Sequence, residues 1–294
     1  MFDLSQIELR VAAMLSGDDF LSKAYLNNLD LHKDAAVEMF GPAILNDPDF
    51  KLVYRHAGKT KNFSDLNLSS AATMRDACMA DTGKDIPLAV FERAVSNRPI
   101  QRPGLWAWQK RMIQDACQNK TIVLPLTGHS RTFSGPTELI EQHRSEIVNF
   151  PIQTIAAVTL QQIAVTFEKI LLEKGLTRCL QILNIYDASV VDSPADEEAA
   201  AIQAFEHAVR HCEQSGYWSE ICKWSGTTIP LKFDQDPITL KTPDPIDLPS
   251  LKQALTELPE TPSVPVKTVS RKKKTSVRKS SDSSETDTLF SKSP

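Results

Sequence analysis

The stretch Asp3-Leu-Ser-Gln-Ile-Glu-Leu-Arg10 decides the fold of this 294-residue chain. Apolar residues recur at a helical period in Ile7, Val11 and Met14, so we predict a helix that directly follows a short strand ending near Asp3. A carboxylate at the end of a strand is held by sheet geometry, and Mg²⁺ prefers oxygen ligands of this kind. An aspartate that caps the N-terminus of the helix is the alternative. The pattern alone leaves both interpretations open.

The octapeptide resembles the DYSQIELR signature (motif A) of family A DNA polymerases and matches it at seven of eight positions. The resemblance implies that Asp3 binds two catalytic Mg²⁺ ions and that the backbone carbonyl of Leu4 also contacts a metal. It implies that Glu8 excludes a ribose 2′-OH. Gln6 would contact the nucleotide and Arg10 the DNA.

A basic helix is predicted over Asp49–Leu68, where Arg55, Lys59 and Phe63 are spaced by four residues. One face of the helix therefore presents two cations and an aromatic ring, which suits the phosphates and base of a nucleoside triphosphate. A solvated basic helix is the alternative. The spacing resembles motif B of the same family, R-x3-K-x3-F-x3-Y-G. Asn67 stands in place of the tyrosine, a departure that bears on fidelity and sugar discrimination.

His32 lies at the start of a second predicted helix, Leu31–Phe40, which ends at Gly41-Pro42. By itself it is a structural residue at a helix start. Asp30-Leu31-His32 is similar to the D-[IL]-H of the family, which implies that His32 contacts the triphosphate, with Lys59 as a catalytic cation.

A second carboxylate, Asp187, is predicted at the tip of a hairpin formed by Leu180–Ile185 and Ser189–Val191. Aspartate is common in turns for local reasons alone. Ile185-Tyr-Asp-Ala188 resembles motif C, V-H-D-E, which implies that Asp187 is the second metal ligand and that Tyr186 contacts DNA. Ala188 replaces the second acid of that motif.

Further upstream, the segment Asn149-Phe-Pro-Ile-Gln153 is similar to N-x-P-x-Q of the family. The resemblance implies contacts of Asn149 and Gln153 with the minor groove of the primer–template, helped by Arg144. A long apolar helix is predicted over Thr154–Glu173, with Pro151 before it.

Few strands and many helices predict an α+β fold with one antiparallel sheet. The remaining predicted elements are helices Pro103–Gln118 and Glu197–Gln214 and strands Thr121–Leu126 and Ile229–Phe233. The resemblance implies a polymerase palm with helical fingers, an incomplete right hand that lacks the thumb and exonuclease domains. The expected domains are palm (1–30, with motif A), fingers (31–120), palm again (121–240, with motif C) and a disordered Pro/Ser/Lys-rich tail (241–294).

Composition narrows the class of protein. Net charge is −4, and the hydrophobic fraction of 41% suits a globular protein with a sizeable core. No apolar run approaches the roughly 20 residues of a membrane span, and the N-terminus lacks a secretory pattern, so we expect a cytoplasmic protein without membrane contact, in the host cytoplasm if it is phage-encoded. The five cysteines form no CxxC pair and indicate neither a disulfide framework nor a zinc site.

Both ends of the chain suggest partners. Only Met1 and Phe2 precede Asp3, so we expect a separate polypeptide with thumb and exonuclease to complete the enzyme. Near the other end, Leu289-Phe290 resembles the end of a sliding-clamp-binding peptide, and the basic run Arg271–Lys274 would add salt-dependent DNA affinity.

Taken together, these patterns predict a DNA-directed DNA polymerase that adds dNTPs to a primer 3′-OH with two Mg²⁺ ions, active with a partner chain. The alternative is a catalytically impaired, polymerase-derived protein that binds DNA or interacts with the replisome. The replacement of an acid by Ala188 and of a tyrosine by Asn67 motivates this alternative.

Overall fold

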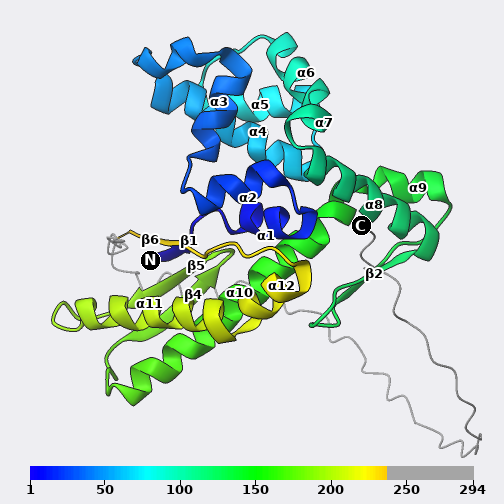
Figure 1. Ribbon diagram of the computed structural model, residues 1–294. Coiled ribbons are helices and arrows are strands. Elements are labelled where there is room, and N and C mark those ends of the chain that lie inside the picture. The colour runs from blue at the N-terminus through cyan, green and yellow to red at the C-terminus, as the bar shows by residue number, and fades with distance from the viewer. Residues whose placement is uncertain (237–294) are drawn as a thin grey trace, which may run out of the picture. The chain divides into compact units, whose positions relative to one another are not determined.

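The computed structural model describes residues 1–236. A four-stranded antiparallel sheet carries the two predicted aspartate segments, around Asp3 and Asp187 (Figure 1). Its strand order is β4-β5-β1-β6, with bounds β1 Phe2–Leu4, β4 Leu180–Ile185, β5 Ala188–Asp192 and β6 Phe233–Gln235. The predicted tail, including Arg271–Lys274 and Leu289-Phe290, lies outside the described residues. The mixed α+β class and the hairpin of β4 and β5 are confirmed.

The last strand begins later than predicted. We expected it over Ile229–Phe233, but β6 shares only Phe233 with that range. The indole Nε1 of Trp218 donates to the Ile229 carbonyl at 2.7 Å, and the Leu231 amide donates to the Glu213 carboxylate at 2.5 Å. Because side chains occupy these backbone groups, Ile229 and Leu231 are not part of the strand, although the Ser5 amide donates to the Lys232 carbonyl at 2.9 Å.

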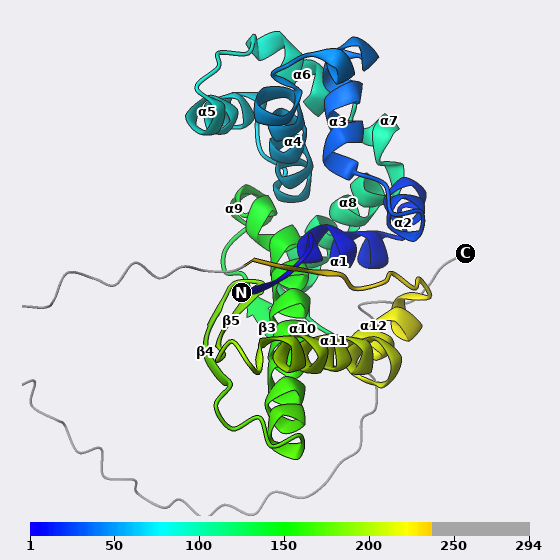
Figure 2. The same ribbon diagram turned by 90° about the vertical axis from the view of Figure 1, so that its left-hand side faces the viewer.

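Three helices, α10 Arg144–Glu173, α11 Glu198–Ser215 and α12 Tyr217–Ser225, form the layer beneath the sheet (Figure 2). Phe2 of β1 stacks on Phe205 of α11, with ring centroids 4.2 Å apart, and Phe167 of α10 meets both rings edge-on. An aromatic cluster therefore anchors the strand that carries Asp3 to its supporting helices.

Helix α10 starts at Arg144, ten residues before the predicted start, and includes Pro151. Ile147, Val148 and Ile152 are fully buried, so the packing of this first part compensates for the backbone hydrogen bond that proline removes. Within residues 1–236, α10 is the one helix long and apolar enough to cross a membrane, which the sequence interpretation overlooked. It packs on α1 Ile7–Ser16, α8 Pro103–Asn119 and α11, as a core helix does.

Asp18 links the starts of two helices, α2 Asp19–Leu26 and α8. Its Oδ1 accepts hydrogen bonds from the amides of Phe20 and Leu21, which caps α2. Its Oδ2 accepts bonds from Gly104 and Leu105 at the start of α8. A Cβ on Gly104 would lie 2.7 Å from the Asp18 Cα, so this approach requires glycine.

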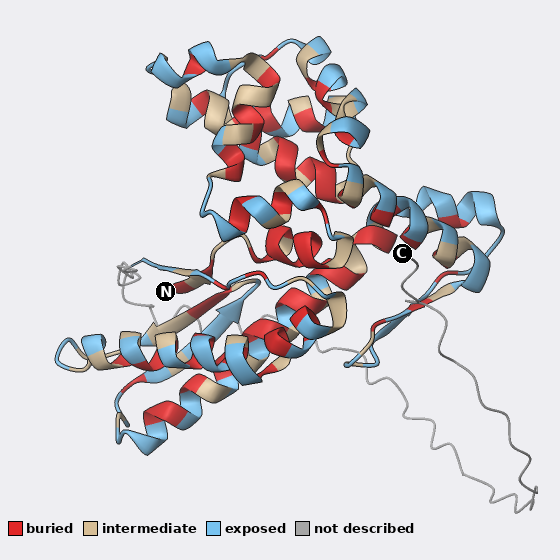
Figure 3. Cartoon of the chain, in the orientation of Figure 1, coloured by how far each residue is buried: buried red, intermediate tan, exposed pale blue. Residues whose placement is uncertain are grey.

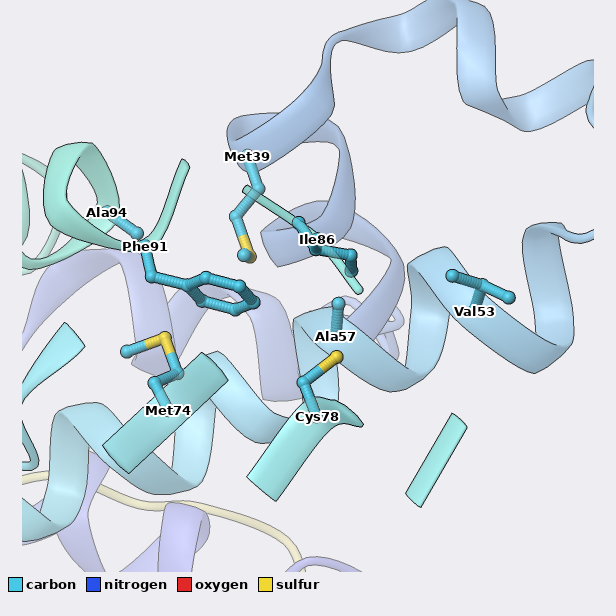
Figure 4. Close-up of a cluster of buried hydrophobic side chains, with 8 residues drawn as sticks. All are labelled: Met39, Val53, Ala57, Met74, Cys78, Ile86, Phe91 and Ala94. Atoms are coloured by element: carbon cyan, nitrogen blue, oxygen red, sulfur yellow. The ribbon is translucent and has the colours of Figure 1, made fainter. Parts of the chain in front are cut away.

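A helical lobe follows α2 in the chain. It comprises α3 Leu31–Phe40, a short 3₁₀ turn Pro42–Asn46, a π-helical turn Phe50–Tyr54, α4 Arg55–Asn67, α5 Ala71–Thr82, α6 Leu88–Ser96 and α7 Arg98–Gln101. The predicted helices over 31–40 and 49–68 are confirmed, except that the second opens with the π turn. A separate buried cluster holds this lobe together (Figure 4); its members are Met39, Val53, Ala57, Met74, Cys78, Ile86, Phe91 and Ala94.

A small ribbon and a short helix complete the described chain. Strand β2 Thr121–Val123 pairs with β3 Ser130–Thr132, and α9 Thr137–Gln142 leads into α10. The described chain therefore contains a second, two-stranded sheet in addition to the one that was predicted. Buried residues concentrate along α1 and the inner side of α10, while α9 and the ribbon are largely exposed (Figure 3).

Candidate active site

Asp3 lies on β1, with strands on both sides. In the ladder it stands opposite Ala188 of β5 and opposite Asp234 of β6. The N-cap of α1 is Gln6, in a left-handed conformation with φ 54°, and no side chain caps the helix. The helix-cap interpretation of Asp3 is therefore wrong, and its half-buried carboxylate has no capping role.

Asp187 lies in the β4–β5 turn and is tied to the first segment by a backbone bond. The Leu4 amide donates to the Asp187 carbonyl at 3.0 Å, so the two predicted metal-ligand segments are neighbours. Tyr186 precedes it with φ 53° and is 95% exposed, which puts the phenol ring on the surface of the turn. Positive φ in a tyrosine is uncommon and fits a tight hairpin turn.

Several acidic groups repel one another here. Burial raises the pKa of Asp3, and the charges of Asp187, Asp234 and Asp236 raise it further, while Lys59 lowers it. Burial and then Asp187 raise the pKa of Glu8. Asp234 and Asp236 were not predicted from the sequence, although the alternation Asp234-Gln-Asp236 next to a predicted strand was a signal for them.

The donor set suits a hard cation such as Mg²⁺. Within residues 1–236, no three His, Cys, Asp or Glu side chains are grouped as a complete metal cage. Mg²⁺ is usually held by one or two carboxylates together with substrate phosphates and water, so Asp3 and Asp187 supply the number and kind of ligand that such a site takes from protein. A positive ion between them would also offset their repulsion.

Helix α4 brings its cations towards this acidic group. The positive charge of Lys59 lowers the pKa of Asp3 and contributes to the lowered pKa of His32. Arg55 pairs with Asp30 through its Nε at 2.8 Å. Phe63 lies on the same side, with its ring centroid 6.3 Å from that of His32.

His32 is a buried, neutral histidine. Burial lowers its pKa to about 4, and the positive charge of Arg55 contributes. The Asn62 amide Nδ2 donates to the Nδ1 of His32 at 3.1 Å, which places the ring proton on Nε2. A neutral imidazole can donate one hydrogen bond without adding charge.

A polar cavity of about 280 Å³ adjoins the base of α3 and the start of α1. It is lined by Ser5, Gln6, Arg10, Tyr25, Asn28, Leu29, Asp30, Arg55, Lys232 and Asp234. Gln6 accepts a hydrogen bond from the Tyr25 hydroxyl at 3.1 Å, so its side chain is fixed at the cavity wall.

Arg10 is bound within the protein. Its Nε donates to the Ser5 carbonyl at 2.8 Å and its Nη1 to the Pro230 carbonyl at 2.5 Å, while the guanidinium lies over the Tyr25 ring. These contacts attach the segment before β6 to α1, and the side chain is buried.

The remaining predicted DNA contacts lie along α10. Arg144 and Gln153 are exposed, and Asn149 is half-buried with its Nδ2 donating to Ser145 Oγ at 3.4 Å. Among the described residues, no hydrogen bond or ion pair joins them to the aspartates. Asn67 is the last residue of α4.

The antiparallel sheet thus brings the segments of Asp3 and Asp187 together, and a basic helix, α4, carries Arg55 and Lys59. The profile of DNA polymerase family A matches residues 1–219, so the chain belongs to this family. The chain is 31% identical to the thermostable DNA polymerase I of Thermus filiformis, covering 68% of this chain and 23% of that protein. It is 26% identical to a DNA polymerase of Bacillus phage SP01, covering 76% and 24%.

The solved polymerase domain of Pol1 from M. smegmatis, in complex with DNA primer–template and dNTP, is similar in fold. The TM-score is 0.61 at 20% identity, over 79% of this chain and 38% of that domain. The chain spans about a fifth to a quarter of the length of the curated relatives, which include DNA polymerase I of Chloroflexus aurantiacus at 28% identity over 66% of this chain and 20% of that protein.

Proposed function

We propose that this chain is the catalytic part of a DNA-directed DNA polymerase that adds dNTPs to a primer 3′-OH. The observation that carries the proposal is the backbone hydrogen bond between Leu4 and Asp187, which joins the two aspartate segments. The positive charge of Lys59, which lowers the pKa of Asp3, supports it. Membership in the polymerase family supports the same conclusion.

The roles follow from the chemistry of each side chain. Asp3, Asp187 and the Leu4 carbonyl would hold two Mg²⁺ ions. Bound there, the ions would supply charge stabilisation for the attacking and leaving oxygens of an in-line displacement. Lys59 and Arg55 would hold the triphosphate, and neutral His32 would donate to it.

Other residues would select the substrate and hold the DNA. Glu8 would exclude a ribose 2′-OH, Gln6 would contact the nucleotide, and Phe63 and Asn67 would contact the base. The DNA contacts assigned to this chain are Arg10, Arg144, Asn149, Gln153 and Tyr186. Exposure favours Tyr186, Arg144 and Gln153, while Arg10 would act by fixing the strand beside Asp3.

In this assignment, 1–30 and 121–240 form the palm and 31–120 the fingers. The functional unit would include a polypeptide that supplies the thumb and exonuclease parts of the enzyme, and it would work in the cytoplasm, that of the host for a phage enzyme. The similarity to both bacterial and phage polymerases supports this setting.

Primer extension tests the proposal. The full chain, with and without a polypeptide carrying the missing polymerase segments, is given primer–template, dNTPs and Mg²⁺. We expect extension that Asp3→Asn and Asp187→Asn each lower by at least about 100-fold, because each removes a metal ligand. Lys223→Gln, on an exposed part of α12, is the matched control and should leave the rate unchanged. Extension that survives both aspartate substitutions would contradict the metal site.

One observation favours the second candidate, a polymerase-derived protein that binds DNA with little catalysis. Ala188 stands directly opposite Asp3 in the ladder, at the place where motif C carries its second acid. If that loss impairs catalysis, Ala188→Glu should raise extension several-fold and tighten Mn²⁺ binding. The variant distinguishes the two candidate functions, because the extension rate of a fully active polymerase should rise little.

A further inference from the structure

A buried network of charged side chains lies on the back of α4. Lys61 is fully buried, and its Nζ lies 2.8 Å from Asp65 Oδ2 and 3.4 Å from Glu38 Oε2 of α3. The other oxygen of Asp65 accepts a bond from Arg98 Nε of α7 at 2.7 Å. Arg102, just before α8, pairs with Glu38 at 3.0 Å.

The same network reaches the backbone at the end of α4. Arg98 Nη2 donates to the carbonyls of Ser64 at 3.1 Å and Ser69 at 2.9 Å. Gln109 of α8 donates from Nε2 to the carbonyls of Asp65 at 2.8 Å and Leu66 at 3.2 Å. Carbonyls at a helix C-terminus lack partners within the helix, and here the side chain of Gln109 occupies those of Asp65 and Leu66.

Position on the helix separates this network from the side of α4 that carries Lys59. Lys59, Phe63 and Asn67 follow each other at intervals of four and share one face of α4. Lys61 and Asp65 are offset from that series by two residues, about 200° around the helix axis, so they occupy the opposite face. The front of α4 thus remains open towards the site while its back is fixed to α3, α7 and α8.

Burying charge is an inefficient way to stabilise a helix contact. Replacing a buried ion pair by apolar residues of similar volume is often neutral or stabilising, whereas a satisfied polar network fixes one geometry. Hydrogen bonds constrain the direction as well as the separation of their partners. We therefore expect the network to fix the position of the last turn of α4 and to add little to the stability of its packing.

We propose that Lys61, Asp65 and Arg98, together with Gln109, are positioning residues that set the place of Asn67 and of the nucleotide-facing side of α4. The proposal rests on the proposed function, in which that side contacts the incoming dNTP. It assigns substrate selection in part to residues of α7 and α8 that do not touch the nucleotide.

The test is the triple variant Lys61→Met, Asp65→Leu, Arg98→Met in the full chain, which replaces the linked charges and leaves the Glu38–Arg102 pair intact. We expect similar thermal stability, but amide hydrogen exchange over 64–68 faster by about 10-fold or more, since local opening becomes easier. In primer extension, KM for the correct dNTP should rise and misincorporation should increase by about 10-fold, with kcat within about twofold.

Arg75→Met, Asp85→Leu is the matched control, because it removes an exposed ion pair of the same lobe and should change none of these values. Gln109→Met is a second variant that removes only the backbone contacts and should shift exchange in the same direction by less. It keeps the test decisive if the triple variant unfolds.

Unchanged exchange over 64–68 in both variants would overturn the proposal, as would altered exchange with unchanged KM and misincorporation in an active enzyme. Hydrogen exchange needs no catalysis, so it separates the two hypotheses. A wild-type chain that fails to extend a primer counts against the proposed function, while its exchange pattern still reports whether the network positions α4.

Discussion

At the scale of single residues, Asp3 combines partial burial with repulsion by neighbouring carboxylates. The carboxylate is half-buried, and Asp187, Asp234 and Asp236 repel its charge. Such repulsion destabilises the folded state when no cation is bound, and functional sites often retain arrangements of this kind. The loss of folding stability caused by this repulsion should therefore be measurable when no metal is bound.

We expect Asp3→Asn to raise the melting temperature in EDTA by a few degrees, because the amide removes the repelled charge and keeps the shape. Adding Mn²⁺ should stabilise the wild-type chain and leave the variant unchanged. Differential scanning calorimetry with and without Mn²⁺ measures both effects. A lower melting temperature for the variant in EDTA would show that Asp3 has favourable partners instead.

His32 gives a prediction about pH. Burial lowers its pKa to about 4, below the ordinary histidine value of about 6.5, with Arg55, Lys59 and His56 contributing and Asp30 opposing. Between these two pKa values the unfolded state binds more protons than the folded state. The free energy of unfolding therefore rises with pH in this window, and the contribution of His32 to stability is lost as the pH falls from about 6.5 to about 4.

We expect His32→Gln to flatten the slope of unfolding free energy against pH in that window. The effect across the full window is of the order of 3 kcal/mol at most. Urea titrations at several pH values measure it, and above pH 7.5 the wild-type slope and that of the variant should coincide. An equal slope for both chains between pH 4 and 6.5 would mean that His32 titrates normally.

At the scale of elements, the contact of α3 with α4 depends on a glycine. A Cβ on Gly58 would lie 2.1 Å from the His32 carbonyl oxygen and 2.8 Å from the Ala36 amide nitrogen. Both are backbone atoms of α3, so the helices would have to separate.

Gly58→Ala should therefore destabilise the fold by about 1–3 kcal/mol despite the better helix propensity of alanine. It should also weaken dNTP binding, since His32 and Lys59 belong to the two helices that are forced apart. Thr60→Ala, on the same helix, is the control and should change stability by less than about 0.5 kcal/mol. Chemical denaturation and nucleotide titration measure both effects; equal stability of Gly58→Ala and wild type would show that the helices can adjust.

The elements also show what sequence alone can predict. Helical periodicity and clear end signals located α3, α8 and the β4–β5 hairpin to within two residues. Local rules failed at Pro151, where buried packing carries α10 through a proline, and before Phe233, where the side chains of Trp218 and Glu213 bind the backbone. Both failures come from tertiary contacts, which local rules do not include.

The candidate site divides in the same way. Motifs A and C indicated Asp3 and Asp187, and the structure brings their segments together. Asp234 was missed because only strand pairing places it opposite Asp3. The Asp65–Arg98 pair, 33 residues apart in the sequence, was missed for a similar reason. Resemblance finds residues in motifs, whereas tertiary contacts determine which other residues accompany them.

At the scale of the whole molecule, the described chain leaves apolar side chains exposed along one edge strand of its sheet. Strand β4 is an outer strand in the order β4-β5-β1-β6. Leu180, Ile182 and Leu183 on it are 56%, 55% and 52% exposed, and Ile185 is 43% exposed. An outer strand with exposed apolar side chains can pair with another chain.

We therefore expect the isolated chain to self-associate at micromolar concentration through β4, and Leu183→Lys to shift it towards monomer by adding a charge to that strand. Leu52→Lys is the matched control, because Leu52 is 75% exposed but lies in the π turn before α4. Sedimentation velocity over a concentration series measures the shift. If a polypeptide carrying the polymerase segments that lie outside the matched part of the relatives covers β4, it should suppress self-association of the wild-type chain and bind Leu183→Lys more weakly. Equal sedimentation of Leu183→Lys, Leu52→Lys and wild type would show that β4 is not the contact surface.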